Sequence, residues 1–288
     1  MNKTEKIPAW RAVVGALSAI AALVVTQLLA MLAGSGIIVL GLPKAAGNVL
    51  AAILYPLLAL VVLKIICGKI LGATLSDCRI PRYKIKPIWA VSAFIMPAIV
   101  IFGLLMTAGH WDNPEMDGAQ IADSITTSVF VAGLAVGAVE EAVFRGVIMK
   151  ALEMRWNKAV AVIVPSVLFG AAHALNGKLS LVSFIQLLVA GSIVGILFSL
   201  VTYESGSIWS SAFMHAIWNM CMARGILNIY TEPMDNCIFN YVLETKNALI
   251  TGGEFGAEAS VISIGAYLIF TVLAVILLKK KSERNEKI

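Results

Sequence analysis

Charged residues are scarce in this chain. Asp, Glu, Lys and Arg make up only 14% of its 288 residues, whereas 59% are apolar and the mean hydropathy is +0.89. An ordinary soluble domain carries about 25% charged residues and about 45–50% apolar ones. The composition therefore excludes a soluble globular protein and indicates one that crosses a membrane several times. In such a protein the net charge of +5 does not indicate nucleic-acid binding, and we expect no nucleic acid among its partners.

Several patterns with well-known chemistry are also missing. The four cysteines contain no Cys-x-x-Cys pair, which argues against a zinc ribbon, a redox motif and a disulfide framework. The chain has no His-Glu-x-x-His, the zinc-binding pattern of many metalloproteases, and no serine in a Gly-x-Ser-x-Gly setting. No aspartate occurs between residues 126 and 226, which excludes a protease with two catalytic aspartates there. We find no internal repeat of the kind that many transporters show.

Long apolar runs dominate what is present, and eight of them are candidates for transmembrane helices. Most reach the roughly 20 residues that a helix needs to cross a hydrocarbon core about 30 Å thick. They lie at about 12–40, 46–66, 88–109, 126–149, 159–175, 180–201, 206–226 and 259–278. The connections are too short to fold alone, and the outer one at 227–258 has the composition of an irregular loop. The sequence therefore predicts an all-α, polytopic membrane protein of about eight transmembrane helices, with residues 1–288 in a single membrane domain.

The distribution of Lys and Arg predicts the orientation, since short loops rich in these residues stay in the cytosol. With the N-terminus in the cytosol, seventeen of the 22 basic residues fall on the cytosolic side and Arg145 falls within a span. The four on the other side are Lys44, Lys178, Arg224 and Lys246. The larger outer connections, 110–125 and 227–258, are acidic instead. We therefore expect a multi-pass protein of the cell membrane with both termini in the cytosol and with membrane lipids as its surroundings.

Polar residues interrupt three of the apolar spans. An ionisable side chain at the centre of a bilayer costs about 2.5–3.5 kcal/mol on insertion scales, so such residues usually face a cavity and carry a function. Here they form three patterns, Glu140-Glu141-x-x-x-Arg145, Phe169-x-x-x-His173 and His215-x-x-x-Asn219. Two of the three histidines of the chain belong to them. Their concentration on three spans indicates a single site.

Helical spacing suggests how the acidic pattern is arranged. Residues four apart lie on one face of a helix, so Glu141 can pair with Arg145. Glu140 is offset from Glu141 by about 100°, at 3.6 residues per turn. One carboxylate can thus be held by the arginine while the other points into a cavity as a base.

Two chemistries fit these residues, and both lead to hydrolysis of a peptide bond. In the first, Glu140 and His173 activate water, while His215 and Asn219 donate hydrogen bonds to the oxyanion. In the second, Glu140, His173 and His215 bind a zinc ion, with water in the fourth position. The sequence does not decide between a metal-dependent and a glutamate-dependent enzyme.

Each pattern also has a purely structural interpretation. Phe169 alone is typical of packing, and His173 alone is typical of a buried histidine that is hydrogen-bonded. His215 and Asn219 could join helices, since polar side chains hydrogen-bond across membrane helices. Only the combination on three spans favours a catalytic site over these alternatives.

The three motifs, in this order on apolar helices, resemble those of the CPBP family of intramembrane endopeptidases. This family includes the type II CAAX prenyl proteases and the lysostaphin-resistance-like (ABI) proteins. The resemblance covers residues 126–226, and it implies a catalytic core of helices around an intramembrane cavity that opens toward the cytosol. It also implies that Glu140 and His173 activate water, that His215 and Asn219 stabilise the oxyanion, and that Glu141, Arg145 and Phe169 support them. The implied substrate is a membrane-associated or lipidated protein or peptide.

Two functions from other classes remain open at this point. Some proteins with these motifs act in bacteriocin immunity or as membrane scaffolds without proteolysis. A proton-coupled transporter also uses buried acids and histidines, in its case to relay protons. A proteolysis assay distinguishes both from an endopeptidase.

Overall fold

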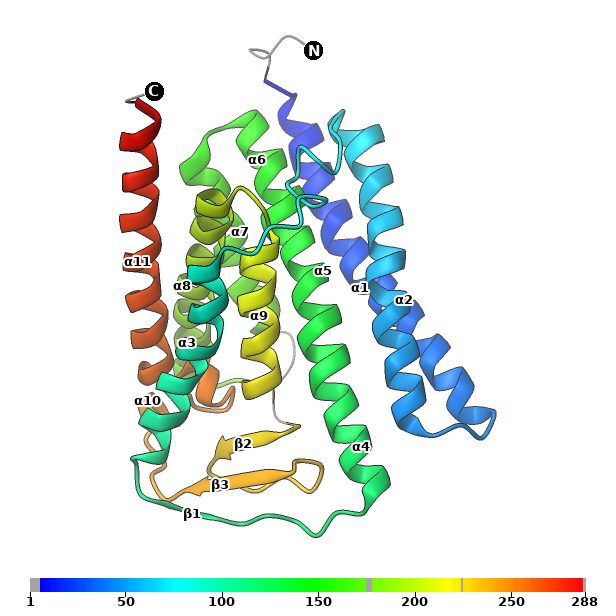
Figure 1. The fold of residues 1–288 in the computed structure, drawn as a ribbon, viewed down its shortest axis with the longest axis vertical. Helices are drawn as coiled ribbons and strands as arrows, with labels where there is room; N and C mark the ends of the chain where they lie inside the picture. The colour runs from blue at the N-terminus through cyan, green and yellow to red at the C-terminus, as the bar shows by residue number, and fades with distance from the viewer. Residues whose placement is uncertain (1–5, 175–177, 224, 287–288) are drawn as a thin grey trace.

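The computed structural model describes residues 6–174, 178–223 and 225–286, and 74% of it is helical. Within these residues, six helices are long and apolar enough to cross a membrane. They are α1 (Ala9–Val39), α2 (Lys44–Ile65) with its π-helical extension η1 (Ile66–Leu71), α3 (Pro87–Leu105), the long helix Gly118–Arg155, α8 (Leu181–Ser205) and α11 (Val261–Glu286). The predicted all-α, polytopic fold is confirmed (Figure 1).

The other two predicted spans form shorter helices. These are α7 (Lys158–His173) and α9 (Trp209–Met222). At 1.5 Å per residue they are about 24 and 21 Å long, which is less than a ~30 Å hydrocarbon core. The predicted count of eight is therefore approximate. Four residues used in the predictions lie outside the described part of the chain, namely Lys3, Leu175, Arg224 and Lys287.

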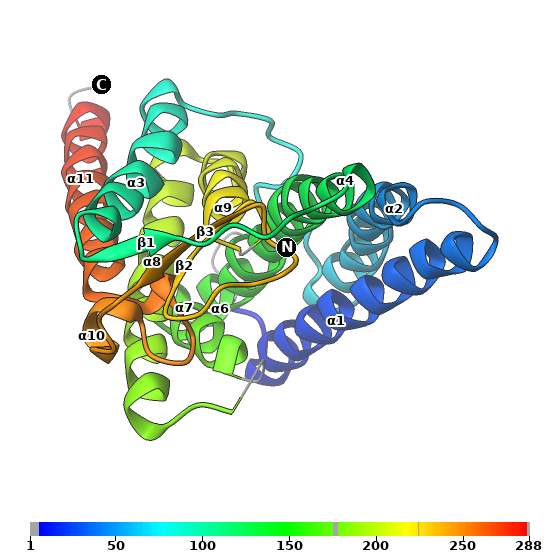
Figure 2. The ribbon, with the colours of Figure 1, turned by 90° about the horizontal axis from the view of Figure 1, so that it is seen from below.

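The long helix Gly118–Arg155 divides the bundle. It lies between the pair α1 and α2 on one side and the remaining helices on the other (Figures 1 and 2). Its consecutive segments are α4 (Gly118–Thr126), η2 (Thr127–Val136), α5 (Gly137–Glu141), η3 (Ala142–Ile148) and α6 (Met149–Arg155). The segments η2 and η3 are π-helical, and such turns often occur at functional sites. They flank the short α-helical turn that carries both acids of the first motif.

A small sheet covers one end of the bundle. Its strands are β1 (Gly109–Trp111), β2 (Leu227–Tyr230) and β3 (Phe239–Leu243), in the order β1-β3-β2. Strand β3 is antiparallel to β1 and parallel to β2. The prediction that 227–258 is irregular was therefore wrong. The strands were missed because β3 pairs with β1, about 130 residues earlier in the chain. Local composition does not reveal such a distant pairing.

Further short elements complete the connection between the sheet and α11. They are α10 (Ala248–Thr251) and the 3-10 turn η5 (Ala257–Ala259). Both lie at the sheet end of the bundle, from which α11 rises to the opposite end (Figure 1).

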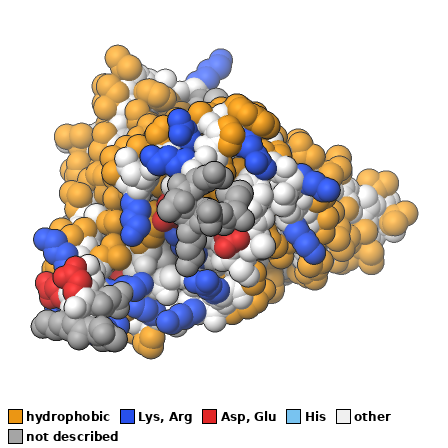
Figure 3. Space-filling view, turned by 90° about the horizontal axis from the view of Figure 1, so that it is seen from above, with side chains coloured by type: hydrophobic (Ala, Val, Ile, Leu, Met, Phe, Trp, Pro, Cys, Tyr) orange, Lys and Arg blue, Asp and Glu red, His pale blue; other side chains and the backbone are white. Residues whose placement is uncertain are grey.

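Both chain ends lie at the end of the bundle opposite the sheet (Figure 1). Lys and Arg side chains gather on that face, with apolar side chains around its sides (Figure 3). The connection between η1 and α3 crosses this end and is tied to α9, since Nε1 of Trp209 donates to the carbonyl of Ile80 at 2.6 Å. The predicted grouping of the termini with most basic residues is thus present in the fold. The compartment that this face meets is still a prediction.

Candidate active site

Two close helix crossings bring the three motifs together. A Cβ built on Gly137 of α5 would lie 3.1 Å from the backbone nitrogen of Ala216 in α9. A Cβ built on Gly191 of α8 would lie only 2.5 Å from Cα of Gly170 in α7. Small residues permit such close backbone approach between membrane helices. The first crossing sets the acidic motif against α9, and the second holds the α7 motif against α8.

Glu141 is the centre of a buried polar network. Its Oε1 accepts a hydrogen bond from Nη1 of Arg145 at 2.8 Å and another from Nδ1 of His215 at 3.1 Å. Glu141 and Arg145 are fully buried, and His215 is 4% exposed. The ion pair predicted from the i,i+4 spacing is therefore present. Because Nδ1 of His215 faces this carboxylate, the tautomer with the proton on Nδ1 is favoured and Nε2 is left for other partners.

Glu140 lies on the neighbouring face of the same turn and has different contacts from Glu141. Its Oε2 is 3.6 Å from Nε2 of His215. This oxygen is buried and has no hydrogen-bond partner in the described part of the chain. A buried carboxylate oxygen without a partner is costly, so it is primed to accept a hydrogen bond from water or substrate. As the helical spacing predicted, Glu141 is the acid that pairs with Arg145, whereas Glu140 does not.

Aromatic rings enclose the Arg145 guanidinium. Its Cζ lies 4.6 Å from the ring centroid of Phe169, 5.4 Å from that of Phe198 and 5.8 Å from that of Phe144. Phe169 also packs against His173, with ring centroids 4.6 Å apart. Phe169 thus separates the buried ion pair from the cavity and connects the second motif to the first.

His173 is the last residue of α7, and its side chain is half-buried. Its Nδ1 is 2.8 Å from the carbonyl oxygen of Phe169, one turn earlier. A carbonyl can only accept, so Nδ1 carries the proton and Nε2 presents a lone pair. The described contacts bring His173 next to Phe169, but none joins it directly to Glu140.

Asn219 connects α9 to the long helix. Its Nδ2 donates to the carbonyl oxygen of Ala132 at 2.9 Å. A carboxamide nitrogen has two N–H groups, so one of them is still able to donate. This fixed carboxamide lies one turn from His215, as the spacing predicted.

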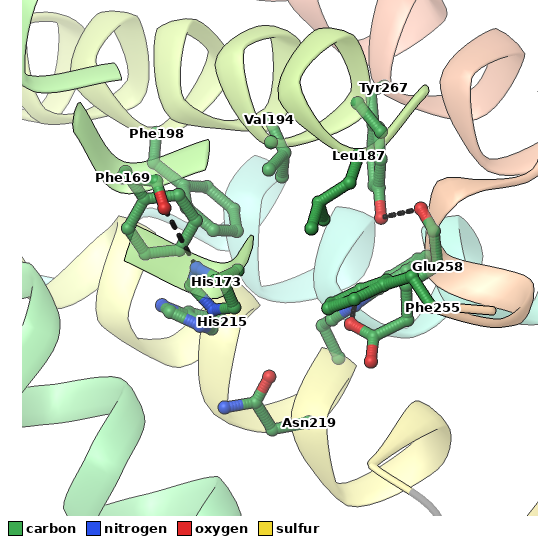
Figure 4. Close-up of a pocket in the computed structure, with 13 residues that line it drawn as sticks. Phe169, His173, Leu187, Val194, Phe198, His215, Asn219, Phe255, Glu258 and Tyr267 are labelled. Atoms are coloured by element: carbon green, nitrogen blue, oxygen red, sulfur yellow. Dashed lines mark hydrogen bonds between the residues drawn. The ribbon is translucent and has the colours of Figure 1, made fainter. Parts of the chain in front are cut away.

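A small cavity of about 50 Å³ joins the second and third motifs. Phe169, His173, His215 and Asn219 all line it (Figure 4). Because one water needs about 10–15 Å³ of such space, the cavity has room for water beside the motif residues. Glu140 is not among its lining residues and contacts the lining residue His215 instead. The structure therefore brings the predicted residues into one site, with Glu140 at its edge.

The opposite wall of the cavity was not predicted from the sequence. It includes Phe255, Glu258 and Tyr267, from the connection before α11 and from α11 itself (Figure 4). Nε1 of Trp218 donates to Oε2 of Glu258 at 2.8 Å. The only sequence signal for this acid is its place immediately before the last apolar span, at 259–278.

The cavity reaches the sheet end of the bundle. Phe255 and Glu258 belong to the connection at that end, and the motif helices α7 and α9 both run toward it (Figure 1). Phe169 and His173 lie in the half of α7 that is nearer the sheet, whereas His215 lies at the middle of α9. The cytosolic opening that the resemblance implies stays a prediction.

The zinc alternative can be tested on the donor atoms. Within the described residues, no group of three His, Cys, Asp or Glu side chains is arranged to hold a metal ion, and this includes Glu140, His173 and His215. His215 directs Nδ1 at Glu141, and His173 directs Nδ1 at a backbone carbonyl, so each Nε2 is left open, as in histidines that bind metals. The three side chains are nevertheless not grouped around one point, so they do not fit a metal centre in this arrangement and we derive no step through a metal.

A family model of known proteins matches the part of the chain that contains the three motifs. Residues 122–221 match the family model described as type II CAAX prenyl endopeptidase Rce1-like. The match covers all three motifs and about a third of the chain, and it confirms the resemblance to the CPBP family. Searches of the curated proteins and of the solved structures returned no match. The chain is thus an integral membrane protein with an Rce1-like domain, which supports a CAAX-type intramembrane endopeptidase in general.

Proposed function

We propose that this protein is an intramembrane endopeptidase that hydrolyses a peptide bond of a membrane-associated or lipidated protein or peptide. The observation that carries the proposal is the division between the two adjacent acids. Oε1 of Glu141 accepts hydrogen bonds from Arg145 and His215, and its Oε2 has no partner among the described residues. Oε2 of Glu140 also has no hydrogen-bond partner there, and Glu140 is not paired with Arg145 but lies 3.6 Å from Nε2 of His215. A positioned carboxylate beside a water-accessible cavity is a suitable general base for hydrolysis.

In the first step, Oε2 of Glu140 takes a proton from a water molecule, and the Nε2 lone pair of His173 orients that water. The water oxygen bonds to the carbonyl carbon of the substrate, and the electron pair of the C=O bond moves to the carbonyl oxygen. In the second step, the C–N bond breaks and the proton on Glu140 passes to the departing nitrogen. The products are a carboxylic acid and an amine, and water is the only other reactant.

His215 and Asn219 stabilise the negative oxygen that forms between these steps. Asn219 donates with the N–H that Ala132 does not use. His215 already donates from Nδ1 to Glu141, so it can donate from Nε2 only when both ring nitrogens are protonated. The buried carboxylate of Glu141 accompanies that positive charge. Donors that are fixed in advance in this way contribute about 10²–10³-fold each in other hydrolases.

Glu141, Arg145 and Phe169 act as positioning residues. Arg145 compensates the charge of Glu141, and Phe169 fills the space between Arg145 and His173. Glu141 and Arg145 are not expected to touch the substrate, whereas Phe169 also lines the cavity.

The charge distribution supports an orientation with both termini in the cytosol and a location in the cell membrane. The basic face in Figure 3 would then meet the cytosol. In this orientation the cavity faces the outer half of the bilayer, and substrate and water enter from the sheet end.

The test is a proteolysis assay with the purified protein in lipid nanodiscs. The substrates are capped fluorogenic decapeptides, and mass spectrometry identifies the bond that is cut. Glu140→Gln should lower kcat/KM by about 10²–10⁴-fold, because loss of a general base has this effect. The matched control is Glu153→Gln on the same long helix, where Glu153 pairs with Arg79 at 2.8 Å, away from the cavity. Cleavage by Glu140→Gln at close to the wild-type rate would refute the proposed role.

A further inference from the structure

A second carboxylate, Glu258, faces the same cavity from the side opposite the motif histidines (Figure 4). It belongs to η5, in a part of the chain outside the Rce1-like match. Its Oε2 accepts a hydrogen bond from Nε1 of Trp218 at 2.8 Å. Trp218 lies between His215 and Asn219 in α9, so the helix that carries the third motif also holds this carboxylate.

Side chains from two helices hold the backbone at this acid. The hydroxyl of Tyr267, on α11, donates to the carbonyl oxygen of Glu258 at 3.1 Å. Ser263 and Gln186 donate to the carbonyls of the residues before and after it, at 2.7 and 2.8 Å. Three consecutive carbonyl groups are thus each bonded to a side chain. The carboxylate is presented to the cavity by a fixed turn.

In the described part of the chain, no cationic side chain compensates Glu258. No Lys, Arg or His nitrogen there lies within 4.0 Å of its carboxylate, and no Lys or Arg lines the cavity. The indole N–H of Trp218, which donates to this carboxylate, is neutral. Glu258 is half-buried in a mostly aromatic and aliphatic wall, where a positive charge close by is favourable. A bound molecule can supply that charge.

Acidic residues outnumber basic ones in the two longer connections at this end. The connection at 106–126 contains four Asp or Glu and no Lys or Arg, and the segment 227–258 contains five Asp or Glu and one Lys. These segments form the end of the bundle that the cavity reaches. Negative charge around the mouth of a cavity attracts cationic ligands and repels anionic ones.

We infer that Glu258 is a specificity residue that binds a Lys or Arg side chain of the peptide substrate, close to the bond that is cut. The preferred substrate is therefore a cationic peptide with otherwise apolar neighbours, and a free carboxylate at the same place is disfavoured. This inference rests on the proposed function, since it names the substrate class of that site.

The test uses acetylated and amidated decapeptides of one apolar sequence, each with a single Lys, Gln or Glu at one position in turn. In wild-type protein, kcat/KM for the Lys peptide should exceed that for the Gln peptide by about ten- to hundredfold at one position. This factor corresponds to the free energy of a hydrogen bond to a charged group. Glu258→Gln keeps an oxygen that can accept from Trp218 but removes the charge, so this ratio should fall to about one because the Lys peptide loses its advantage. Glu258→Lys should reverse the preference toward the Glu peptide.

The matched control is Glu254→Gln in the same connection. Hydrogen bonds from the hydroxyls of Ser183 and Ser180 lower the pKa of Glu254, so it too is a carboxylate, but it is exposed and does not line the cavity. It should leave the Lys-to-Gln ratio unchanged. Equal cleavage of Lys and Gln peptides by wild-type protein at every position would overturn the inference. An equal loss of all cleavage in a folded Glu258→Gln protein would overturn it too, since that result indicates a general role.

Binding to an inactive protein separates the inference from the proposed function. Fluorescence anisotropy measures the Kd of the same peptides for Glu140→Gln and for Glu140→Gln with Glu258→Gln. A Lys preference that disappears with Glu258 supports the specificity role even if no peptide is hydrolysed, and hydrolysis would then be the proposal that fails. Equal Kd values for the Lys and Gln peptides overturn the specificity role whether or not cleavage occurs.

Discussion

Replacing Arg145 with Met is expected to destabilise the protein strongly. The side chains of Arg145 and Glu141 are 1% and 0% exposed, and Oε1 of Glu141 receives hydrogen bonds from Arg145 and His215 alone. Arg145→Met would leave the buried carboxylate with only the imidazole as a charged partner. Breaking one side of a buried ion pair costs about 3–5 kcal/mol. The three aromatic rings that now surround the guanidinium can still pack against Met, so most of the loss is electrostatic.

The assay is thermal unfolding in detergent, followed by tryptophan fluorescence. A change of 1 kcal/mol shifts Tm by about 2 °C in a chain of this size, so Tm should fall by about 6–10 °C. The double variant Glu141→Gln with Arg145→Met removes both charges and should recover most of this loss, because well-packed neutral residues often replace a buried pair at little cost. The matched control is Arg79→Met, which breaks a more exposed pair worth at most about 1 kcal/mol.

Two outcomes would contradict this reasoning. If Arg145→Met unfolded within about 2 °C of the wild type, the pair would contribute no more than a surface salt bridge. If the double variant were as unstable as the single one, the loss would come from packing around the guanidinium and not from the unpaired carboxylate.

Three further outcomes are expected. Gly191→Ala should cost about 1–3 kcal/mol of stability and lower activity, because its Cβ would meet the α7 backbone, whereas Gly265→Ala, with open space at its Cβ, should do neither. Elemental analysis of active protein should find far less than one metal ion per chain, and one equivalent of zinc lost together with activity would contradict this. In a cysteine-free background, Phe255→Cys in the cavity should react with a membrane-impermeant thiol reagent from outside cells, and Ser282→Cys only from inside. Reaction of Phe255→Cys from the cytosolic side alone would reverse the proposed orientation of the cavity.

The helical fold was predictable because the bilayer imposes a simple requirement on sequence. A spanning segment must satisfy its backbone hydrogen bonds internally and present apolar side chains, so long apolar runs identify it. The prediction was weakest for α7 and α9, since both helices are shorter than the hydrocarbon core of a bilayer. The sheet was not predictable, because β3 is defined by its partners β1 and β2 and not by its own residues.

The candidate site was predictable where contacts lie within one helix. The pair Glu141–Arg145 follows from i,i+4 spacing and is present. The contact between Glu141 and His215 joins residues 74 positions apart and depends on the close approach that Gly137 allows. Glu258 was missed because it stands in an irregular turn, where no periodicity assigns a residue to a face.

The wall opposite the motifs shows most clearly what spacing along a helix omits. Counting residues places His173 at the end of its apolar span, and it is the last residue of α7. Such counts give depth along single helices but not which connection closes the space between them. In the fold, the connection before α11 supplies part of that wall, with Glu258 on it. In the proposed function, substrate enters on the side away from the basic face. The proposed specificity role of Glu258 then connects this one carboxylate to the charge of the preferred peptide.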